Sequence, residues 1–195
     1  EGLARDGGLF VPTTYPDLSA QLEKLKQLSY CDLAFEIFQP YTNQSIPESD
    51  LKNIIKNSYA TFHNQQVTPL KHLSNETVLE LFHGPTLAFK DVALQFLGNL
   101  FEWILSQQNN QLNILGATSG DTGSAAIMGI RGKKNINIFI LHPKGKISEI
   151  QEKQMTTVLD DNVFNIAIEG TFDDGQTIIK EVFNDLDFKD QYHLG

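Results

Sequence analysis

Apolar side chains recur every three or four residues between positions 18 and 62, a spacing that is typical of amphipathic helices. The pattern predicts a helix capped by Asp17, a second helix over residues 32–38 that Pro40 ends, and a third helix that begins near Pro47. The three stripes are Leu18, Leu22, Leu25 and Leu28; Phe35 and Phe38; and Leu51, Ile54, Ile55, Tyr59 and Phe62. We interpret these stripes as packing surfaces and not as ligand sites.

Short extended segments flank these helices. Asp6-Gly7-Gly8 predicts a turn, followed by an apolar strand or extended piece that runs to Pro12. Residues 69–73 and 78–82 predict two short strands that are joined by a turn at residues 74–76.

After position 90 the pattern changes to an alternation of helices and strands. A wide apolar helix face comes first, formed by Ala93, Leu94, Leu97, Leu100, Phe101, Ile104 and Leu105. Strands are then predicted over residues 112–117, 136–142 and 163–168, and helices over residues 124–131, 148–159 and 173–183. This alternation predicts an α/β fold with a parallel doubly wound sheet behind a helical N-terminal lead-in. We expect a division near Lys90, with residues 1–90 and 91–190 on its two sides.

Composition and charge narrow the function. Among the 195 residues, 24 acidic and 15 basic side chains give a net charge of −9, and no basic stripe suggests a nucleic-acid partner. Cys31 is the one cysteine, so no internal disulfide can form, and a reducing compartment such as the cytoplasm is expected. No apolar run approaches the length of a membrane-spanning helix, and no secretory signal is visible.

Lys90 occupies an unusual position. It follows a Gly84-Pro85 turn and comes directly before the strongest predicted helix, where the positive end of the helix dipole disfavours a cation. Only about 0.04% of a free lysine amine is neutral at pH 7, whereas attack on a carbonyl needs the neutral form. A helix N-terminus and an apolar pocket both favour that form, so the position indicates a chemical role for Lys90.

A glycine-rich turn, GATSGDTGSA at residues 116–125, lies between a predicted strand and a predicted helix. Open α/β folds bind ligands at such places. The glycines let the backbone approach a ligand closely, and the hydroxyl and backbone N–H groups can hold a carboxylate or a phosphate. The spacing matches neither a P-loop nor a dinucleotide-binding fingerprint, so the pattern alone leaves open a tight turn with a capping residue.

The segments HGPTLAFKD around Lys90 and TSGDTG at residues 118–123 resemble threonine synthases, which are pyridoxal-phosphate enzymes of fold type II. GLARDGGLFVP near the N-terminus and EGTFDDGQ at residues 169–176 are also similar to that family, so the resemblance covers nearly the whole chain. It implies a carbon–oxygen lyase acting on a phosphate, which converts O-phospho-L-homoserine and water to L-threonine and phosphate in threonine biosynthesis. It further implies a small-molecule substrate and no membrane or nucleic-acid partner.

The resemblance also assigns roles to individual residues. Lys90 would form the internal Schiff base with pyridoxal 5'-phosphate and then act as a general acid and base. The substrate carboxylate would be held by Thr118, Ser119, Gly120 and Thr122. Asp121 would lie near the cofactor ring, at a position where related fold-type II enzymes have asparagine. His83 would either touch the cofactor or hydrogen-bond the turn.

The resemblance also identifies what is missing from this sequence. The glycine-rich loop that holds the cofactor phosphate in this family is not found, and neither is the strand that precedes GLARDGG. We therefore expect residues 1–90 to be a lead-in and the start of a large domain, and residues 91–190 to be a smaller substrate-side domain. The remainder of the large domain would be absent, so cofactor binding and catalysis by this piece alone should be weak.

Three alternatives remain open at this point. The first is a threonine synthase-like phospho-lyase that releases a keto acid. The second is a non-enzymatic α/β module that binds anions, in which Lys90 only contacts a phosphate. The third is a structural fragment without activity. Lys133, Lys134, Lys144 and Lys146 are interpreted as solvated loop charges, and the histidines lack the spacing of metal ligands.

Overall fold

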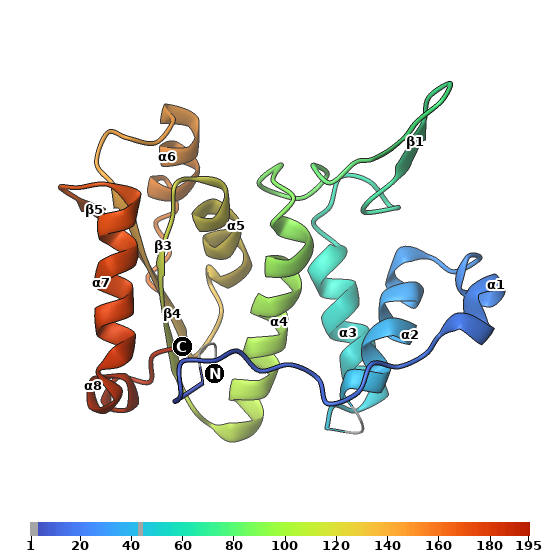
Figure 1. Cartoon of the computed structure of the whole chain (residues 1–195), viewed down its shortest axis with the longest axis horizontal. Coiled ribbons are helices and arrows are strands. Elements are labelled where there is room, and N and C mark those ends of the chain that lie inside the picture. The colour runs from blue at the N-terminus through green and yellow to red at the C-terminus, as the bar shows by residue number, and fades with distance from the viewer. Residues whose placement is uncertain (1–3, 43–44) are drawn as a thin grey trace.

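The computed structural model describes residues 4–42 and 45–195. Figure 1 shows a helical part and a hairpin on one side of the long helix α4, and an α/β layer on its other side. None of the helices in the described ranges is long and apolar enough to cross a membrane.

The helical part contains four elements. They are the 3₁₀ turn η1 (Ser19–Gln21), α1 (Leu22–Leu25), α2 (Tyr30–Thr42) and α3 (Glu48–Tyr59). Most of the predicted stripe is buried: Leu51, Ile55 and Tyr59 of α3 pack into one hydrophobic cluster with Ala34, Phe35 and Val67, and Phe62 packs half-buried against it. Cys31 is half-buried beside this cluster, and burial raises the pKa of its thiol.

Two predictions for this part are wrong. Asp17 does accept a hydrogen bond from the Ser19 N–H at 2.9 Å, but only two short turns follow instead of a full helix. Leu25 is the only buried residue of that stripe, and such short segments are not stable helices without packing. Pro40 does not end α2, because it lies in the last turn of the helix, where only one backbone hydrogen bond is lost.

The predicted extended segment after Gly8 forms no strand within the described chain, and Leu9, Phe10 and Val11 are exposed. Residues 1–3, which precede the predicted turn, lie outside the described residues. The predicted pair of strands is confirmed in shorter form, as the antiparallel hairpin of β1 (Leu70–His72) and β2 (Thr77–Leu79).

The alternating part of the chain folds as predicted into a parallel sheet. Its elements are α4 (Asp91–Gln108), β3 (Leu112–Ala117), α5 (Asp121–Ile130), β4 (Ile136–Pro143), α6 (Glu149–Thr156), β5 (Val163–Ile168), α7 (Phe172–Asn184) and α8 (Leu186–Gln191). The strand order is β3-β4-β5, and both pairings are parallel. Helix α8, which Asp185 caps by accepting from the Phe188 N–H at 3.0 Å, was not predicted. Helix α5 begins three residues before the predicted position, and α6 ends three residues earlier.

Helices cover both faces of the sheet (Figure 1). On β4, Ile136, Ile138 and Ile140 contribute to a cluster with Ile127 of α5 and Met155 of α6. The side chains of Phe139 and Leu141 alternate with these and face α7. The doubly wound arrangement expected from the sequence is therefore present around a three-stranded core.

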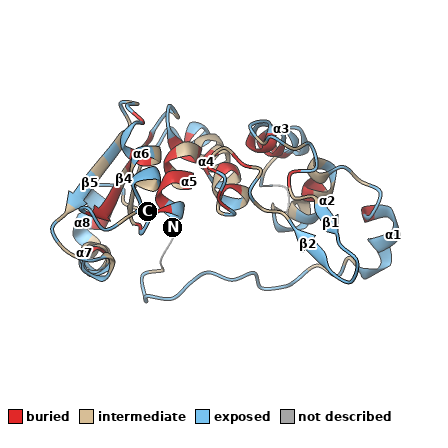
Figure 2. Cartoon of the chain, turned by 90° about the horizontal axis from the view of Figure 1, so that it is seen from above, coloured by how far each residue is buried: buried red, intermediate tan, exposed pale blue. Residues whose placement is uncertain are grey.

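Buried residues gather in two places, one between α2 and α3 and the other between the sheet and its helices (Figure 2). Helix α4 lies between the two clusters and packs against both α3 and α5. The division of the chain into two domains near Lys90 stays a prediction.

Helices α4 and α5 approach each other at two glycines. A Cβ on Gly98 would lie 2.1 Å from the Gly129 carbonyl oxygen, and a Cβ on Gly129 would lie 2.5 Å from the Leu94 carbonyl oxygen. Real side chains cannot occupy that space, so the two backbones touch because both positions are glycine. This contact fixes the position of α4 relative to α5.

Candidate active site

Lys90 lies at the N-cap of α4, as its position in the sequence predicts, and its side chain is half-buried. Its Nζ lies 4.8 Å from the centre of the Phe89 ring. Within the described chain the amine makes no hydrogen bond and no ion pair. It is therefore a cation without a carboxylate partner, beside the positive end of a helix.

The loop before Lys90 is compact and strained. The Leu87 N–H donates to the Gly84 carbonyl at 3.1 Å, and the Asp91 N–H donates to the Ala88 carbonyl at 3.0 Å. Leu87 has a φ of 62°, in the left-handed region that residues other than glycine rarely adopt. Such strain persists only where the surrounding structure holds it in place.

Helix α3 anchors the first turn of α4. The Tyr59 hydroxyl donates a hydrogen bond to the Val92 carbonyl at 3.1 Å. Burial strongly raises the pKa of the Tyr59 phenol, so the hydroxyl keeps its proton and can donate over the whole physiological pH range. The backbone next to Lys90 is thus tied to the helical part of the chain.

His83 lies at the base of the same loop and is held by neighbours. Its Nε2 lies 2.8 Å from Glu80 Oε2, and its carbonyl accepts from the His63 N–H at 2.8 Å. Its ring also contacts the Phe82 ring, with 4.6 Å between the centres. These contacts hold His83 against the residues that precede the lysine loop, and its role toward the turn or the cofactor stays a prediction.

In the glycine-rich turn, Thr118 organises the backbone. Its side chain is 2% exposed, and its Oγ1 accepts from the Gly120 N–H at 3.0 Å and from the Gly123 N–H at 2.9 Å. Gly120 has a φ of 149°, a conformation that is costly for residues with a side chain. The hydroxyl of Thr118 is therefore used within the turn itself.

Three backbone donors of the turn stay open. The N–H groups of Ser119, Asp121 and Thr122 have no acceptor among the described residues, and neither do the hydroxyls of Ser119 and Thr122. All three residues are exposed. Open N–H groups at a helix N-terminus form an anion site. Asp121 Oδ1 accepts from Gln151 Nε2 of α6 at 2.6 Å, so its carboxylate is already engaged.

Lys90 and this turn lie at the same end of the molecule. Gln95 Nε2 donates to the Ala125 carbonyl at 3.2 Å, and these are the fifth residues of α4 and α5 respectively. The two helices therefore begin at the same level, as Figure 1 shows. An open amine and a set of open N–H donors thus lie at the same end of the molecule, at the starts of two helices that pack against each other.

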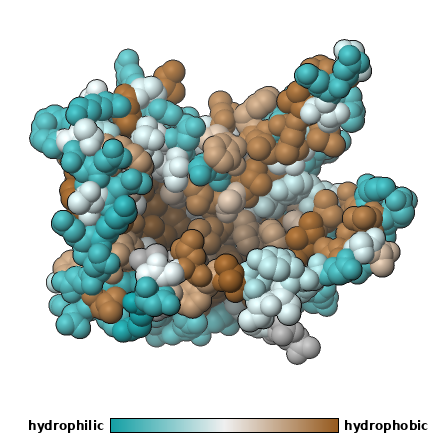
Figure 3. All heavy atoms as spheres, viewed as in Figure 1, coloured by the Kyte–Doolittle hydropathy of each residue, from teal (hydrophilic) through white to brown (hydrophobic). Residues whose placement is uncertain are grey.

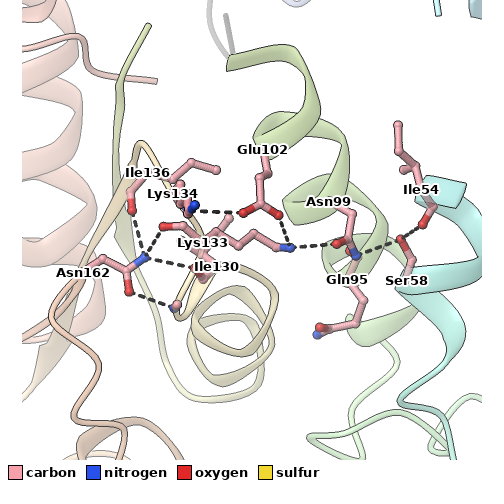
Figure 4. A network of polar contacts seen from close by, with 11 residues as sticks. Ile54, Ser58, Gln95, Asn99, Glu102, Ile130, Lys133, Lys134, Ile136 and Asn162 are labelled. Atoms are coloured by element: carbon pink, nitrogen blue, oxygen red, sulfur yellow. Dashed lines mark hydrogen bonds and ion pairs between the residues drawn. The ribbon is translucent and has the colours of Figure 1, made fainter. Parts of the chain in front are cut away.

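A polar network joins the helical part to the α/β layer (Figure 4). Asn99 of α4 donates to Ser58 Oγ of α3 at 3.1 Å and accepts from Lys133 Nζ at 2.7 Å. Lys133 also lies 3.1 Å from Glu102 Oε2, and its side chain is only 15% exposed. The prediction that Lys133 is a solvated loop charge is wrong, because the lysine packs against α4 and is paired there.

The other loop lysines differ. Lys144 forms an exposed ion pair with Glu169 at 2.6 Å.

No group of three or more histidine, cysteine, aspartate or glutamate side chains in the described ranges is arranged to hold a metal ion.

The sequence did not reveal the residues of α4 and α6 that hold the lysine loop by hydrogen bonds. Asp91, Gln95 of α4 and Gln154 of α6 all hydrogen-bond to this loop or its neighbours. The spacing of Asp91 and Gln95, four residues apart on a helix, was a signal for the first contact. No local pattern indicates Gln154, because it reaches the loop from 68 positions away.

Known proteins match this chain over its whole length. Residues 1–59 match the family described as threonine synthase N terminus. The threonine synthase of Schizosaccharomyces pombe is 52% identical over the entire chain. The crystal structure of the pyridoxal-phosphate-bound threonine synthase from Brucella melitensis superposes with a TM-score of 0.92 at 46% identity, and that of the yeast enzyme with a TM-score of 0.90 at 50% identity.

The matches cover a larger share of this chain than of its relatives. All of this chain is covered, but only 40% of the S. pombe protein, 42% of the Brucella chain and 41% of the yeast chain. The chain thus spans about two-fifths of the length of these relatives, and it shares their fold over that part. It belongs to the threonine synthase family, and it corresponds to the N-terminal part of its members.

Proposed function

We propose that this protein is a pyridoxal-phosphate-dependent threonine synthase, a lyase that converts O-phospho-L-homoserine and water to L-threonine and phosphate. The observation that carries the proposal is the amine of Lys90, which has no hydrogen-bond or ion-pair partner in the described chain and lies at a helix N-cap. The family relationship supports it, since a relative of known structure binds pyridoxal phosphate.

The environment of Lys90 fits attachment of an aldehyde cofactor. A lysine that attacks a carbonyl must lose its proton, and a paired carboxylate would oppose that loss. No carboxylate of the described residues pairs with the Lys90 Nζ. When bound, the cofactor would supply an electron sink. The Lys90 Nζ would hold it and would then carry protons to and from the substrate carbons.

The glycine-rich turn would bind the substrate carboxylate. Ser119 and Thr122 offer open hydroxyls and N–H groups, and the open Asp121 N–H lies between them. Thr118 and Gly120 would shape the turn through the Thr118 hydroxyl, and in this way they would contribute to substrate binding. Asp121 would lie near the cofactor ring, with its carboxylate oriented by Gln151.

His83 would support the cofactor pocket from the base of the lysine loop, where Glu80 orients its ring.

The glycine-rich turn is a small, exposed anion site, and such sites bind through a few directed donors. The proposed partner is therefore a small molecule, O-phospho-L-homoserine.

The test is product analysis with the full chain, pyridoxal phosphate and O-phospho-L-homoserine. Equal amounts of threonine and phosphate are expected. Phosphate with a keto acid in place of threonine would identify a threonine synthase-like phospho-lyase instead. Binding of phosphate without any turnover and without covalent capture of the cofactor would overturn the proposal in favour of an anion-binding module.

A further inference from the structure

Asp91 follows Lys90 directly and is fully buried. Its Oδ2 accepts from the Thr86 N–H at 2.8 Å, and its Oδ1 accepts from Thr86 Oγ1 at 2.9 Å and from Gln95 Nε2 at 3.0 Å. No lysine, arginine or histidine in the described ranges forms an ion pair with it. The carboxylate is therefore held by three neutral donors and by the N-terminus of its own helix.

These contacts hold the lysine loop rather than the helix alone. Thr86 lies in the middle of the loop, and Asp91 binds both its N–H and its hydroxyl. From the other side, Gln154 Nε2 of α6 donates to the Thr86 carbonyl at 3.2 Å. Every polar group of Thr86 thus has a partner, and the loop is clamped between α4 and α6.

Packing around Asp91 adds to this clamp. A Cβ on Gly84 would lie 2.4 Å from the Asp91 Cβ, so the start of the loop rests directly on the aspartate. Between these points Leu87 keeps its left-handed φ of 62°. A strained backbone needs such surrounding contacts to persist.

We propose that Asp91 is a positioning residue for Lys90, an inference that rests on the proposed function. Its carboxylate holds Thr86, and through Thr86 the whole loop, so that the Lys90 Nζ is presented in one place. Because three donors already occupy both oxygens, the carboxylate is turned away from the neighbouring amine and does not pair with it. The lysine therefore stays available for the carbonyl of the cofactor.

The test is the rate at which the full chain captures pyridoxal phosphate at Lys90, measured by borohydride trapping and peptide mapping. Asp91→Asn replaces one acceptor oxygen with an NH₂ group, which cannot accept from Gln95 or from the Thr86 hydroxyl in their present orientations. The rate of capture at Lys90 should fall by about ten- to a hundredfold, as misplacement of a reacting group by about 1 Å can produce. Capture at exposed lysines should not change.

Matched variants separate positioning from general damage. Asp50→Asn alters a carboxylate of α3 that accepts from Trp103 Nε1 at 3.1 Å, away from the loop, and should leave the rate of capture at Lys90 unchanged. Thr86→Val removes only the hydroxyl donor and should slow capture in the same direction, whereas Thr86→Ser should restore it. This pair carries the test if Asp91→Asn does not fold, which thermal unfolding without cofactor would show.

The outcomes are distinct. Scattered capture in the unmodified chain would overturn the proposed function and this inference together. Selective capture at Lys90 that persists at the normal rate in folded Asp91→Asn and Thr86→Val chains would overturn the positioning role and leave the proposed function standing. Equal slowing by Asp50→Asn would also overturn it, because the effect would then not depend on the clamp.

Discussion

Two helix N-termini lie level at one end of this molecule, and they are completed in opposite ways. At α4 the donors of the preceding loop are satisfied from within, by the Asp91 carboxylate, and the open group is a lysine amine. At α5 the internal acceptor is the neutral Thr118 hydroxyl, which uses only some of the donors. Three backbone N–H groups are left facing outward.

The difference shows how one structural feature can serve two purposes. A helix N-terminus whose loop donors are already bound by its own carboxylate offers few donors to an external anion. A terminus completed by a neutral hydroxyl keeps its partial positive charge for a ligand. We infer that α4 presents the nucleophile and that α5 presents the anion site.

Removal of the Lys90 amine should have the largest effect on function. Lys90→Ala in the full chain should reduce turnover by at least about a thousandfold, because no other group can attach the cofactor at that position. The thermal unfolding midpoint should change little, since the amine has no partner to lose among the described residues. Lys71→Ala, on the exposed hairpin, is the control, and near-normal turnover by Lys90→Ala would contradict the assignment.

The second prediction concerns the glycine contact that holds the N-termini of α4 and α5 level. Gly98→Ala places a Cβ 2.1 Å from a backbone oxygen of α5, so the helices must move apart. The free energy of unfolding should fall by about 2–4 kcal/mol, and any chain that still folds should lose the level alignment of Lys90 and the glycine turn. Urea unfolding measures the first effect. A loss below about 0.5 kcal/mol would show that the two helices can separate freely.

The third prediction tests the role of the Thr118 hydroxyl, the neutral acceptor at the start of α5. Thr118→Val keeps the shape of the side chain and removes the hydroxyl, which leaves the Gly120 and Gly123 N–H groups without this partner. Stability should fall by about 1–3 kcal/mol. Thr118→Ser should retain most of the stability because it keeps the hydroxyl. Chemical denaturation of the three chains decides this, and equal stability of the valine and serine variants would refute it.

The smallest effect concerns a third helix N-terminus, that of α7. Asp174 and Thr171 form a capping box there, and hydrogen bonds from the Thr171 N–H and hydroxyl lower the pKa of the exposed Asp174 carboxyl from its ordinary value of 3.8. A lowered pKa stabilises the fold above that ordinary value, and the contribution is lost as the pH falls through the lowered one.

The Asp174→Asn chain should therefore lose less stability than the unmodified chain when the pH is lowered below 3.8. Thermal unfolding against pH measures this. Asp173→Asn is the matched control, since the Asp173 carboxylate accepts no hydrogen bond from the described residues. A steeper loss of stability in Asp174→Asn would contradict the capping role.

The fold was predictable where one local rule decided the structure. Strands β3 and β5 begin and end at the predicted residues, because short apolar runs bounded by turn residues favour strands. The helix at Asp17 was overestimated, since its stripe has too few partners to bury. Pro40 was given too much weight, because the cost of a proline depends on its place in the helix.

The candidate site was predictable in its residue types but not in its contacts. Lys90 was noticeable because a cation at a helix N-terminus is a misfit, and the glycines indicated a close approach of the backbone. The clamp on Thr86 was not visible, since Gln154 lies 68 positions away along the chain. Nor could the sequence show that the Thr118 hydroxyl is used inside the turn while its neighbours stay open.

Lys90 at the start of α4 has the position and surroundings expected of a lysine that holds an aldehyde cofactor. The most direct test is borohydride trapping of the full chain with pyridoxal phosphate, followed by peptide mass mapping of every lysine. We expect preferential labelling of Lys90 over the exposed lysines, such as Lys144 and Lys153. Labelling spread evenly over the lysines, with no preference for Lys90, would contradict it.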